Sequence, residues 1–313
     1  MSASVCVVTV TYRSETTIGM CLRALPAACE GLDADAVVID NFSDDFTLEA
    51  ARDAAAAIGA TVPVVVVPRS SNAGFAVGAN AGMRRGLERG ADWILFCNPD
   101  AVLPPGSVAG LVAAAEAWPR AALVSPTLLN LDGSPQPMVE RTYRLGRALA
   151  GMARIGGANR ARPAPTSGAP VKVDWFHGAV VLAPGDLMRQ LGGWDEGYFL
   201  YAEDMDLCLR AARAGADSVV VPTVQVPHIS GASSILGGGE VARAADRVAG
   251  MGRFLNKEHG KWAASVFGLA TTLTSVPAAL VAKARGNDLL TRMQWAKART
   301  GLRTAAGFGP KRR

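Results

Sequence analysis

The sequence predicts an α/β fold with a mainly parallel sheet, followed by a helical region at the C-terminal end. Short apolar runs alternate with segments of helical spacing through the first part of the chain, a pattern typical of a parallel sheet covered by helices on both faces. Half of the 313 residues are hydrophobic and 19% are charged, which fits a large core and excludes a disordered chain. The helical region is indicated by an uncharged run at 263–282, between Lys261 and Lys283.

Each expected element follows from its apolar pattern. The continuous run at 5–10 predicts a fully buried strand, and Ile18, Leu22 and Leu25 recur at the spacing of one helical face. By the same reasoning, we expect strands at 5–10, 36–39, 62–67, 93–97, 121–124 and 219–221, with further strand-like runs within 171–183. The expected helices are 16–28, 46–58, 78–89, 106–117 and 205–214.

The composition divides the chain into two regions. Residues 1–235 are expected to form one domain with two halves, 1–125 and 126–235. Residues near 144–170 are rich in Gly, Ala, Arg and Pro and predict a mobile loop. Residues 236–313 predict a separate helical, basic region.

The cysteines and the N-terminus indicate the compartment. The five cysteines have the spacing of neither a zinc site nor a disulfide framework. Cys6 and Cys97 lie in predicted strands, where a thiol acts as a small hydrophobic group. Because the chain begins with no secretory signal pattern, we expect a reducing, cytoplasmic setting.

The C-terminal region combines apolar residues with positive charge. The formal net charge is +5, and the tail after Asp288 contains basic residues but no acid, which favours anionic partners. The run at 263–282 is long enough to span a bilayer, but its hydroxyl residues and Pro277 make it a weak span. We expect it to lie on or dip into a membrane surface, with basic neighbours at anionic headgroups. The alternative is a helical hairpin packed on the domain.

Polar side chains follow three of the predicted strands, where ligands bind in folds of this class. They are Thr11-Tyr12, Asp40-Asn41 and Asn98-Pro99-Asp100. Asp100 is suited to hold a divalent cation against a diphosphate, and Asp40 to accept the imide hydrogen of a pyrimidine base. For both residues the alternative is a turn that caps the next helix.

A run of small residues at 71–80 precedes a predicted helix, whose N-terminus favours anions. Gly74, Gly78 and Gly82 are spaced by four, so the dinucleotide pattern G-x-G-x-x-G is absent. This spacing argues against a nicotinamide dehydrogenase.

Two acidic residues, Glu203 and Asp204, come directly before the helix expected at 205–214. Asp204 is suited to take a proton from an attacking hydroxyl, while Trp194 could stack on a sugar ring. The alternative is that the acids of the first turn only complement the helix dipole. His228, after a strand, could complete the metal shell of Asp100, and His177 could line an acceptor site.

These residues, in this order, resemble the inverting family-2 glycosyltransferases with the GT-A fold, and within them the rhamnosyltransferase-like branch. The resemblance covers about residues 5–230. It rests on stretches 7–12, 38–43, 72–80, 98–100 and 178–215, the last with its Gly-Gly-Trp-Asp-Glu and Glu-Asp-Met-Asp-Leu-Cys-Leu-Arg runs.

The resemblance implies a nucleotide-sugar donor bound by the 1–125 half, an acceptor bound by the 126–235 half, and Mg²⁺ or Mn²⁺. The implied base is Asp204, and the implied metal ligands are Asp100 and His228. The implied donor-binding residues are Thr11, Tyr12, Arg13, Asp40, Asn41, Asn72, Gly74, Phe75, Asn80, Asn98, Pro99 and Asp100. The implied acceptor-binding residues are His177, Gly178, Trp194, Asp195 and Glu203.

Two departures from the family pattern bear on this expectation. Asn98 stands where the family's Asp-x-Asp motif has its first acid, so metal binding rests more heavily on Asp100. The Gln-x-x-Arg-Trp motif of processive synthases is missing, which favours the addition of one sugar or a few.

The function expected is transfer of L-rhamnose from dTDP-L-rhamnose to a lipid-linked acceptor, such as a polyprenyl-diphosphate GlcNAc, or to a cell-envelope glycan. The enzyme would work on the inner face of the cell membrane, and an oligomer is compatible with the sequence. The alternatives are another UDP- or dTDP-sugar, a sugar-nucleotide pyrophosphorylase, or a non-catalytic glycan-binding protein. A nucleic-acid partner is not expected, because the basic runs lack interleaved aromatic residues.

Overall fold

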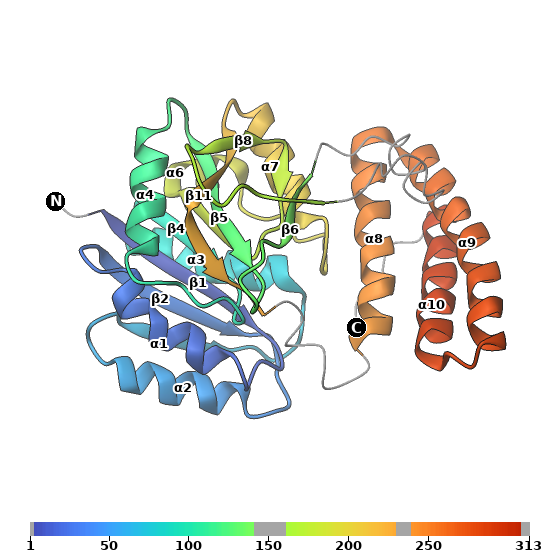
Figure 1. The fold of residues 1–313 in the computed structure, drawn as a ribbon, viewed down its shortest axis with the longest axis horizontal. Coiled ribbons are helices and arrows are strands. Elements are labelled where there is room, and N and C mark those ends of the chain that lie inside the picture. The colour runs from blue at the N-terminus through green and yellow to red at the C-terminus, as the bar shows by residue number, and fades with distance from the viewer. Residues whose placement is uncertain (1–2, 141–160, 230–238, 308–313) are drawn as a thin grey trace. The chain divides into compact units, whose positions relative to one another are not determined.

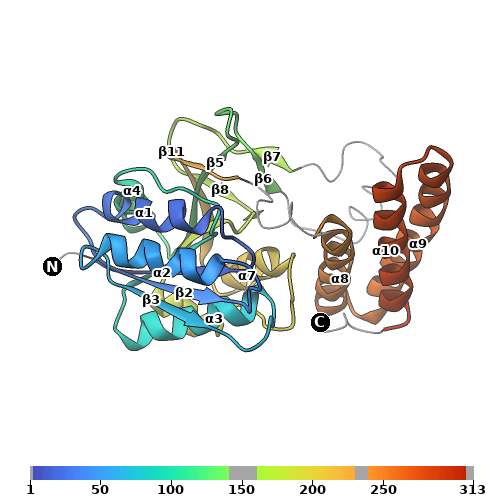
Figure 2. The same ribbon diagram turned by 90° about the horizontal axis from the view of Figure 1, so that it is seen from below.

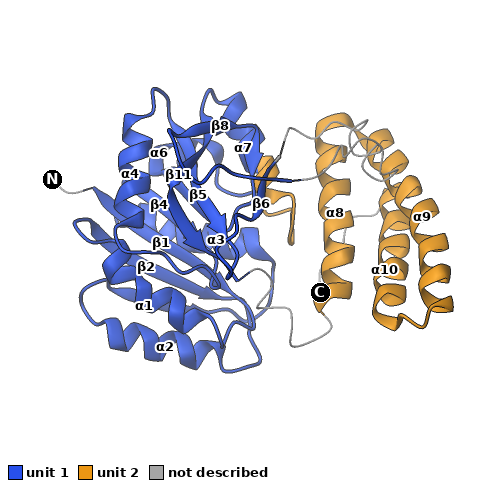
Figure 3. Ribbon diagram, viewed as in Figure 1, with its two compact units in different colours: residues 1–141, 161–195, 207–233 blue, residues 142–160, 196–206, 234–313 orange. Residues whose placement is uncertain are grey.

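The computed structural model describes residues 3–140, 161–229 and 239–307. They fall into two compact units, shown in blue and orange in Figure 3. The first comprises residues 1–141, 161–195 and 207–233, and the second 142–160, 196–206 and 234–313. Most of the loop predicted near 144–170 lies outside the described residues.

The first unit is built on an eight-stranded sheet with the order β3-β2-β1-β4-β10-β5-β11-β8. Its strands are β1 (Ser4–Thr11), β2 (Asp33–Asp40), β3 (Val64–Pro68), β4 (Trp93–Cys97), β5 (Ala122–Leu129), β8 (Val171–Val173), β10 (Val180–Pro184) and β11 (Asp217–Pro227). The first four strands are mutually parallel, and β5 is parallel to β11. Since β10 is antiparallel to both β4 and β5, all six of those strands point the same way. The predicted α/β class with a mainly parallel sheet is therefore confirmed.

The helices of this unit are α1 (Ile18–Ala28), α2 (Thr47–Ile58), α3 (Phe75–Glu88), α4 (Ser107–Ala117) and α6 (Gly185–Leu191). Figure 2 shows α1 and α3 on opposite faces of the sheet. A small antiparallel sheet is formed by β6 (Pro137–Glu140), β7 (Arg162–Pro163) and β9 (Trp175–Phe176). Helix α7 (Glu203–Arg213) follows α6 in the chain.

The glycines of α3 set how closely this helix approaches β1. A Cβ at Gly78 would meet Val10, one at Gly82 would overlap Val8, and one at Gly86 would meet Cys6. Every fourth helical residue therefore faces every second strand residue. The four-residue glycine spacing in the sequence is explained mainly by helix–strand packing.

The second unit contains α8 (Gly239–His259), α9 (Lys261–Ala284) and α10 (Asp288–Ala305), drawn in orange to red in Figure 1. The C-terminal helical region expected from the sequence is therefore present. Val248 and Leu255 of α8 form an apolar cluster with Phe267 of α9. Helices α9 and α10 approach closely at Gly268 and Gly301, where a Cβ on either residue would meet the backbone of the other.

Helix α9 runs through the whole uncharged segment without a break. Within the described part of the chain it alone has the length and mean hydropathy, 1.6, to cross a membrane, and 33% of its apolar window is buried. Length and composition alone are weak support for a membrane span, because a buried helix can have both.

Candidate functional site

The candidate residues of the first unit gather at one edge of the eight-stranded sheet. Strands β1, β2, β4 and β11 have their carboxyl ends there, because they point the same way. Strand β10 runs in the opposite direction and begins there, opposite Cys97 of β4. The strand-end edge therefore carries Thr11-Tyr12, Asp40-Asn41, Asn98-Pro99-Asp100, His177-Gly178 and His228. The sequence placed all of these residues except His177-Gly178 at strand ends, and the topology brings the ends together.

Buried polar atoms without partners lie at the ends of β1 and β2. Thr11 pairs with Asp40 in the sheet, and the backbone N–H of Asn41 donates to the Thr11 carbonyl at 2.8 Å. The Thr11 hydroxyl and the Asn41 side-chain oxygen are buried, and neither has a hydrogen-bond partner among the residues that the structure describes. Unsatisfied buried polar groups are costly. A ligand that supplied their missing partners would bind here with a favourable contribution.

Asp40 is almost fully buried, with 2% of its surface exposed. Its carboxylate accepts hydrogen bonds from the Ser43 hydroxyl at 2.5 Å and from the Ser43 backbone N–H at 3.1 Å. This is the turn geometry that the sequence offered as the alternative role. Because a carboxylate has about four acceptor positions, these two hydrogen bonds leave acceptor capacity on Asp40, and its contact with a base stays a prediction.

Two non-glycine residues beside these strand ends have left-handed backbone. They are Arg13, with a φ of 51°, and Phe42, with a φ of 67°. Such conformations store strain and cluster at binding sites. The Arg13 guanidinium makes two hydrogen bonds to Asp44 and stacks over the ring of Tyr12, 5.5 Å from its centre. Phe42 is exposed, so its ring is available to a ligand.

Loop residues before α3 are fixed by two asparagines. The Asn72 side-chain oxygen accepts from the Gly74 N–H at 3.0 Å, and the Asn41 side chain donates to the Gly74 carbonyl at 2.9 Å. Gly74 has a φ of 94°, which favours glycine. Phe75 then begins α3. The loop predicted to approach a ligand is thus tied directly to the end of β2.

Asn80 has a structural role that the sequence did not reveal. Its amide donates to the Trp194 carbonyl at 2.8 Å and accepts from the Trp194 N–H at 2.8 Å. Trp194 is 2% exposed and packs edge-on against Phe75 and Phe96, each 5.1 Å from its centre. Direct donor contact by Asn80 and acceptor contact by Trp194 stay predictions.

Asp100 and His228 are neighbours at the strand-end edge. The His228 Nε2 lies 3.2 Å from the Asp100 Oδ1, and both side chains are mostly buried. Short backbone contacts join them, because Ala101 bridges to His228 and the Ile229 N–H donates to the Asp100 carbonyl at 2.9 Å. The sequence paired these two residues, and the structure brings them together.

Gln136 orients the His228 ring, and the sequence did not indicate this role. Its amide nitrogen donates to the backbone carbonyls of Leu129 at 3.3 Å and His228 at 2.6 Å. Its oxygen therefore faces the His228 Nδ1, 3.0 Å away. Since an amide oxygen only accepts, the hydrogen of a neutral ring sits on Nδ1. The lone pair of Nε2 then points to Asp100, as in a metal-ligating histidine.

The Asp100 carboxylate and the His228 ring could supply two ligands to a divalent cation whose other ligands come from outside the protein. Among the described residues there is no group of three or more His, Cys, Asp or Glu arranged to hold a metal. Mg²⁺ in phosphate chemistry uses one or two protein ligands together with substrate oxygens and water. The site therefore suits a cation that binds with a diphosphate better than one held by protein alone.

His177 and Gly178 lie between β9 and β10. The His177 N–H donates to the Met138 carbonyl at 2.8 Å, and its ring is 5.4 Å from the ring of Trp175. Asp195 is partly exposed and follows the buried Trp194. Acceptor binding by these residues stays a prediction.

Glu203 and Asp204 open α7 and belong to the second unit. The Asp204 carboxylate accepts from the Met205 N–H at 2.8 Å, and its side chain is partly exposed. Glu203 is buried, and one of its carboxylate oxygens has no partner. Burial, followed by the nearby charges of Asp204 and Asp206, raises the pKa of Glu203 to about 8. The raised pKa favours the neutral form of Glu203, whereas the Asp204 side chain is partly exposed.

Comparison with known sequences identifies the relatives of this chain. Residues 3–236 match a family described as "Glycosyltransferase like family 2". An N-acetylglucosaminyl-diphospho-decaprenol L-rhamnosyltransferase of Mycobacterium tuberculosis is 32% identical over 71% of this chain and 75% of its own length. Galactofuranosyltransferase GlfT1 of Mycolicibacterium smegmatis is 28% identical over 75% and 74%.

Solved structures with the same fold are more distant in sequence. A mannosyltransferase from Pyrobaculum calidifontis, in complex with GDP-Man and Mn²⁺, aligns with a TM-score of 0.57. The alignment covers 97% of this chain and 87% of that chain, at 17% identity. At that identity the likeness concerns the fold alone.

Proposed function

The chain belongs to glycosyltransferase family 2, and from that premise we propose that it transfers L-rhamnose from dTDP-L-rhamnose to a lipid-linked acceptor of the polyprenyl-diphosphate GlcNAc type. The observation that carries the proposal is the 32% identity to the mycobacterial rhamnosyltransferase, which extends over most of both chains. The reaction would invert the anomeric carbon in a single displacement.

In this proposal the strand-end edge binds the donor. Asp40 accepts the imide hydrogen of thymine, while Thr11 and Asn41 offer the buried polar atoms that now lack partners. Tyr12, Arg13, Asn72, Gly74 and Phe75 surround the nucleotide with ring and backbone groups. Asn98, Pro99 and Asp100 follow the end of β4 and lie toward the diphosphate.

Asp100 and His228 are the residues that would hold the divalent cation. When bound, Mg²⁺ or Mn²⁺ neutralises charge that develops on the departing diphosphate. The chain's own contribution is to keep the Asp100 Oδ1 and the His228 Nε2 close together, 3.2 Å apart. Gln136 maintains that orientation through its contact with the other ring nitrogen.

Asp204 is the proposed base. A positioned carboxylate that takes the acceptor's hydroxyl proton contributes roughly 10²–10⁴ in rate. Asp204 suits this role better than Glu203, since the raised pKa of Glu203 favours its protonated form, which cannot accept the proton. Glu203, Asp195, His177 and Gly178 are proposed to shape the acceptor site.

Helix α9 supports the proposed membrane location, because its exposed face is apolar, whereas the exposed face of a helix in a soluble protein is usually polar. Apart from Phe267, which packs on α8, most of its large apolar side chains are exposed: Trp262, Val266, Leu269, Leu273 and Leu280, with Leu273 at 71%. They recur at helical spacing along one face, here called the α9 stripe. The opposite, buried face contains mostly small and hydroxyl residues.

Partly buried hydroxyls of α9 bond inside the helical unit. Thr272 donates to the carbonyls of Gly268 and Ala298, and Ser265 to that of Ala305. An exposed apolar stripe with basic neighbours such as Lys283 and Arg285 is typical of helices that lie at an anionic membrane surface. We propose that the α9 stripe docks there, on the cytoplasmic face, where lipid-linked acceptors are presented.

The direct test uses the purified full chain with Mg²⁺ or Mn²⁺ and a panel of nucleotide sugars. Release of dTDP from dTDP-rhamnose, stimulated by GlcNAc-diphosphate-polyprenol, is expected, and the product should carry one added deoxyhexose by mass spectrometry. Faster turnover of another UDP- or dTDP-sugar would keep the family and replace the donor. Pyrophosphate in place of nucleoside diphosphate, or no turnover of any sugar, would refute the proposal.

A further inference from the structure

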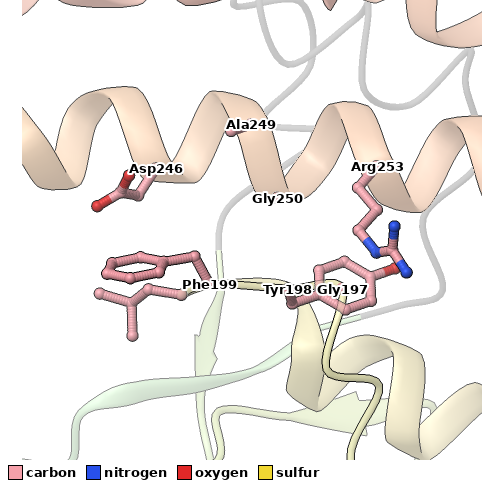
Figure 4. Close-up of a pocket in the computed structure, with 8 residues that line it drawn as sticks. Gly197, Tyr198, Phe199, Asp246, Ala249, Gly250 and Arg253 are labelled. Atoms are coloured by element: carbon pink, nitrogen blue, oxygen red, sulfur yellow. The ribbon is translucent and has the colours of Figure 1, made fainter. Parts of the chain in front are cut away.

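The acidic turn, residues 196–206, packs against one face of α8 within the second unit. The residues of α8 that contact it recur at helical spacing: Asp246, Arg247, Gly250, Arg253 and Lys257. Figure 4 shows Arg253 reaching from α8 toward Tyr198 and Gly197. The space left between them is a cavity of about 10 Å³, which is about the volume of a single water probe. The interface is therefore closely packed.

The backbone of the acidic turn is strained just before the proposed base. Tyr201 has a φ of 70° and Ala202 a φ of 69°, both left-handed in residues other than glycine. Such a pair costs free energy and persists only where the surroundings enforce it. The first helical hydrogen bond of α7, from the Asp206 N–H to the Ala202 carbonyl at 3.0 Å, starts from this strained residue. The turn thus decides where α7 begins and where Asp204 points.

Contacts from α8 enforce the strained conformation. At Gly250 the helix has no side chain, and a Cβ there would overlap the Tyr201 carbonyl oxygen. The Arg247 guanidinium lies over the Tyr201 ring, 4.9 Å from its centre, and that of Arg253 lies over the Tyr198 ring at 5.0 Å.

An ion pair fixes the helical side of the turn. The Lys257 Nζ lies 2.6 Å from the Asp206 Oδ1, and the Asp206 side chain is 1% exposed. The Tyr198 hydroxyl donates to the same oxygen at 3.5 Å. Because a buried carboxylate without its cation is strongly unfavourable, Lys257 holds the first turn of α7 in place.

From these contacts we infer that α8 is part of the catalytic machinery: Gly250 and Lys257 are positioning residues that hold the Tyr201–Ala202 turn and thereby aim Asp204. The inference rests on the proposed role of Asp204 as the base. It assigns to the helical region a function in the chemical step, beyond any attachment to a membrane.

The test compares two glycine variants of the same helix. Gly250→Ala places a methyl group against the Tyr201 carbonyl, whereas Gly252→Ala places one against the Thr304 side chain of α10. We expect Gly250→Ala to lower kcat by roughly 100-fold, the effect of a displacement of about 1 Å at a reacting group, with the KM for donor unchanged. Gly252→Ala, the matched control for disturbance of α8, should retain kcat within about threefold. Thermal unfolding of both variants measures the folded fraction, to which kcat is normalised.

A second series does not depend on the folding of Gly250→Ala. Lys257→Met should lower kcat about tenfold or more at unchanged donor KM, and Lys257→Arg should recover most of that loss because it restores a cation to Asp206. An equal loss of kcat in Gly250→Ala and Gly252→Ala would overturn the inference, as would full activity in Lys257→Met. Asp204→Asn, measured alongside, separates the two proposals: wild-type activity in that variant would refute the base itself.

Discussion

The strand-end edge and the acidic turn are supported in opposite ways. Residues at the edge follow directly from strands, and the β1–β2 ladder fixes Thr11 and Asp40 through their own backbone. Asp100 is fixed by the Ile229 N–H, which donates to its carbonyl, and by the bridge between Ala101 and His228. The acidic turn has no such ladder. It is left-handed at Tyr201 and Ala202, and contacts from α8, later in the chain, hold it.

This difference separates binding from rate. A site supported by the sheet is rigid without a ligand and is suited to holding a nucleotide and a cation. A turn supported by side-chain contacts can be displaced by a single methyl group. We therefore expect variants at the edge to change affinity for donor and metal, and variants at the turn to change kcat.

The sharpest prediction concerns Asp204. Asp204→Asn keeps the size of the side chain but removes the proton acceptor, so we expect kcat to fall by roughly 10²–10⁴. Donor affinity, measured by calorimetry with a nucleotide sugar, should stay within about threefold, because the edge is untouched. A parallel loss of donor affinity and rate would break the separation between turn and edge.

At the edge, the corresponding variant is Gln136→Leu. Loss of the contact to the His228 Nδ1 frees the ring, and removal of such a partner typically weakens metal binding about 10–100-fold. The measurement is Mn²⁺ titration by electron paramagnetic resonance in the presence of dTDP. Gln136→Glu, which still accepts from Nδ1, should bind Mn²⁺ more tightly than Gln136→Leu. Equal Mn²⁺ affinity in Gln136→Leu and wild type would show that orientation of the His228 ring by Gln136 does not contribute to metal binding.

The third region to compare is the α9 stripe, an exposed apolar surface. Leu269→Ser with Leu273→Ser should weaken binding to anionic vesicles by roughly tenfold or more, since each buried leucine contributes about 1.5–3 kcal/mol. Turnover of a water-soluble acceptor should be retained. Leu131→Ser, at a leucine of the first unit that is 75% exposed, is the control. Unchanged vesicle binding at high salt in the double variant would exclude the stripe as the docking surface.

The smallest effect is expected from Glu203, and it concerns stability. The folded-state pKa of about 8 lies above the unfolded value of 4.5, so the unfolded chain releases this proton at lower pH. The stabilising contribution is therefore complete below about pH 4.5 and is lost as the pH rises to about 8. Between pH 5 and pH 8, Glu203→Gln should reduce the fall in the free energy of unfolding by roughly 1–3 kcal/mol. The measurement is urea unfolding across this pH range. Parallel stability–pH curves for the two proteins would contradict the raised pKa.

The sequence predicted those parts of the molecule that depend on local pattern. Continuous apolar runs placed β1, β2 and β4 within a few residues of their observed bounds, and the strand ends then placed Asp40 and Asp100 at one edge. The pairing of Asp100 with His228 was also expected. These successes share a cause, since each residue lies next to an element that its own neighbours specify.

The parts that were not predicted depend on contacts between distant residues. Nothing near Gln136 marks it as the partner of His228, which lies 92 positions later. The glycines of α3 indicated a loop near a ligand, but their spacing reflects the packing of the helix on β1. Lys257 carried no signal at all, because only the fold brings it to Asp206.

The link between Asn80 and Trp194 has a consequence for biosynthesis. The two residues are 114 positions apart, and both amide atoms of Asn80 depend on the later one. At about 5–20 residues per second, a ribosome takes roughly 6–23 s to reach Trp194 after Asn80 emerges from synthesis. During that interval the Asn80 side chain cannot form its two hydrogen bonds to the Trp194 backbone. The β1–β4 half therefore completes this part of its packing only after translation has passed Trp194.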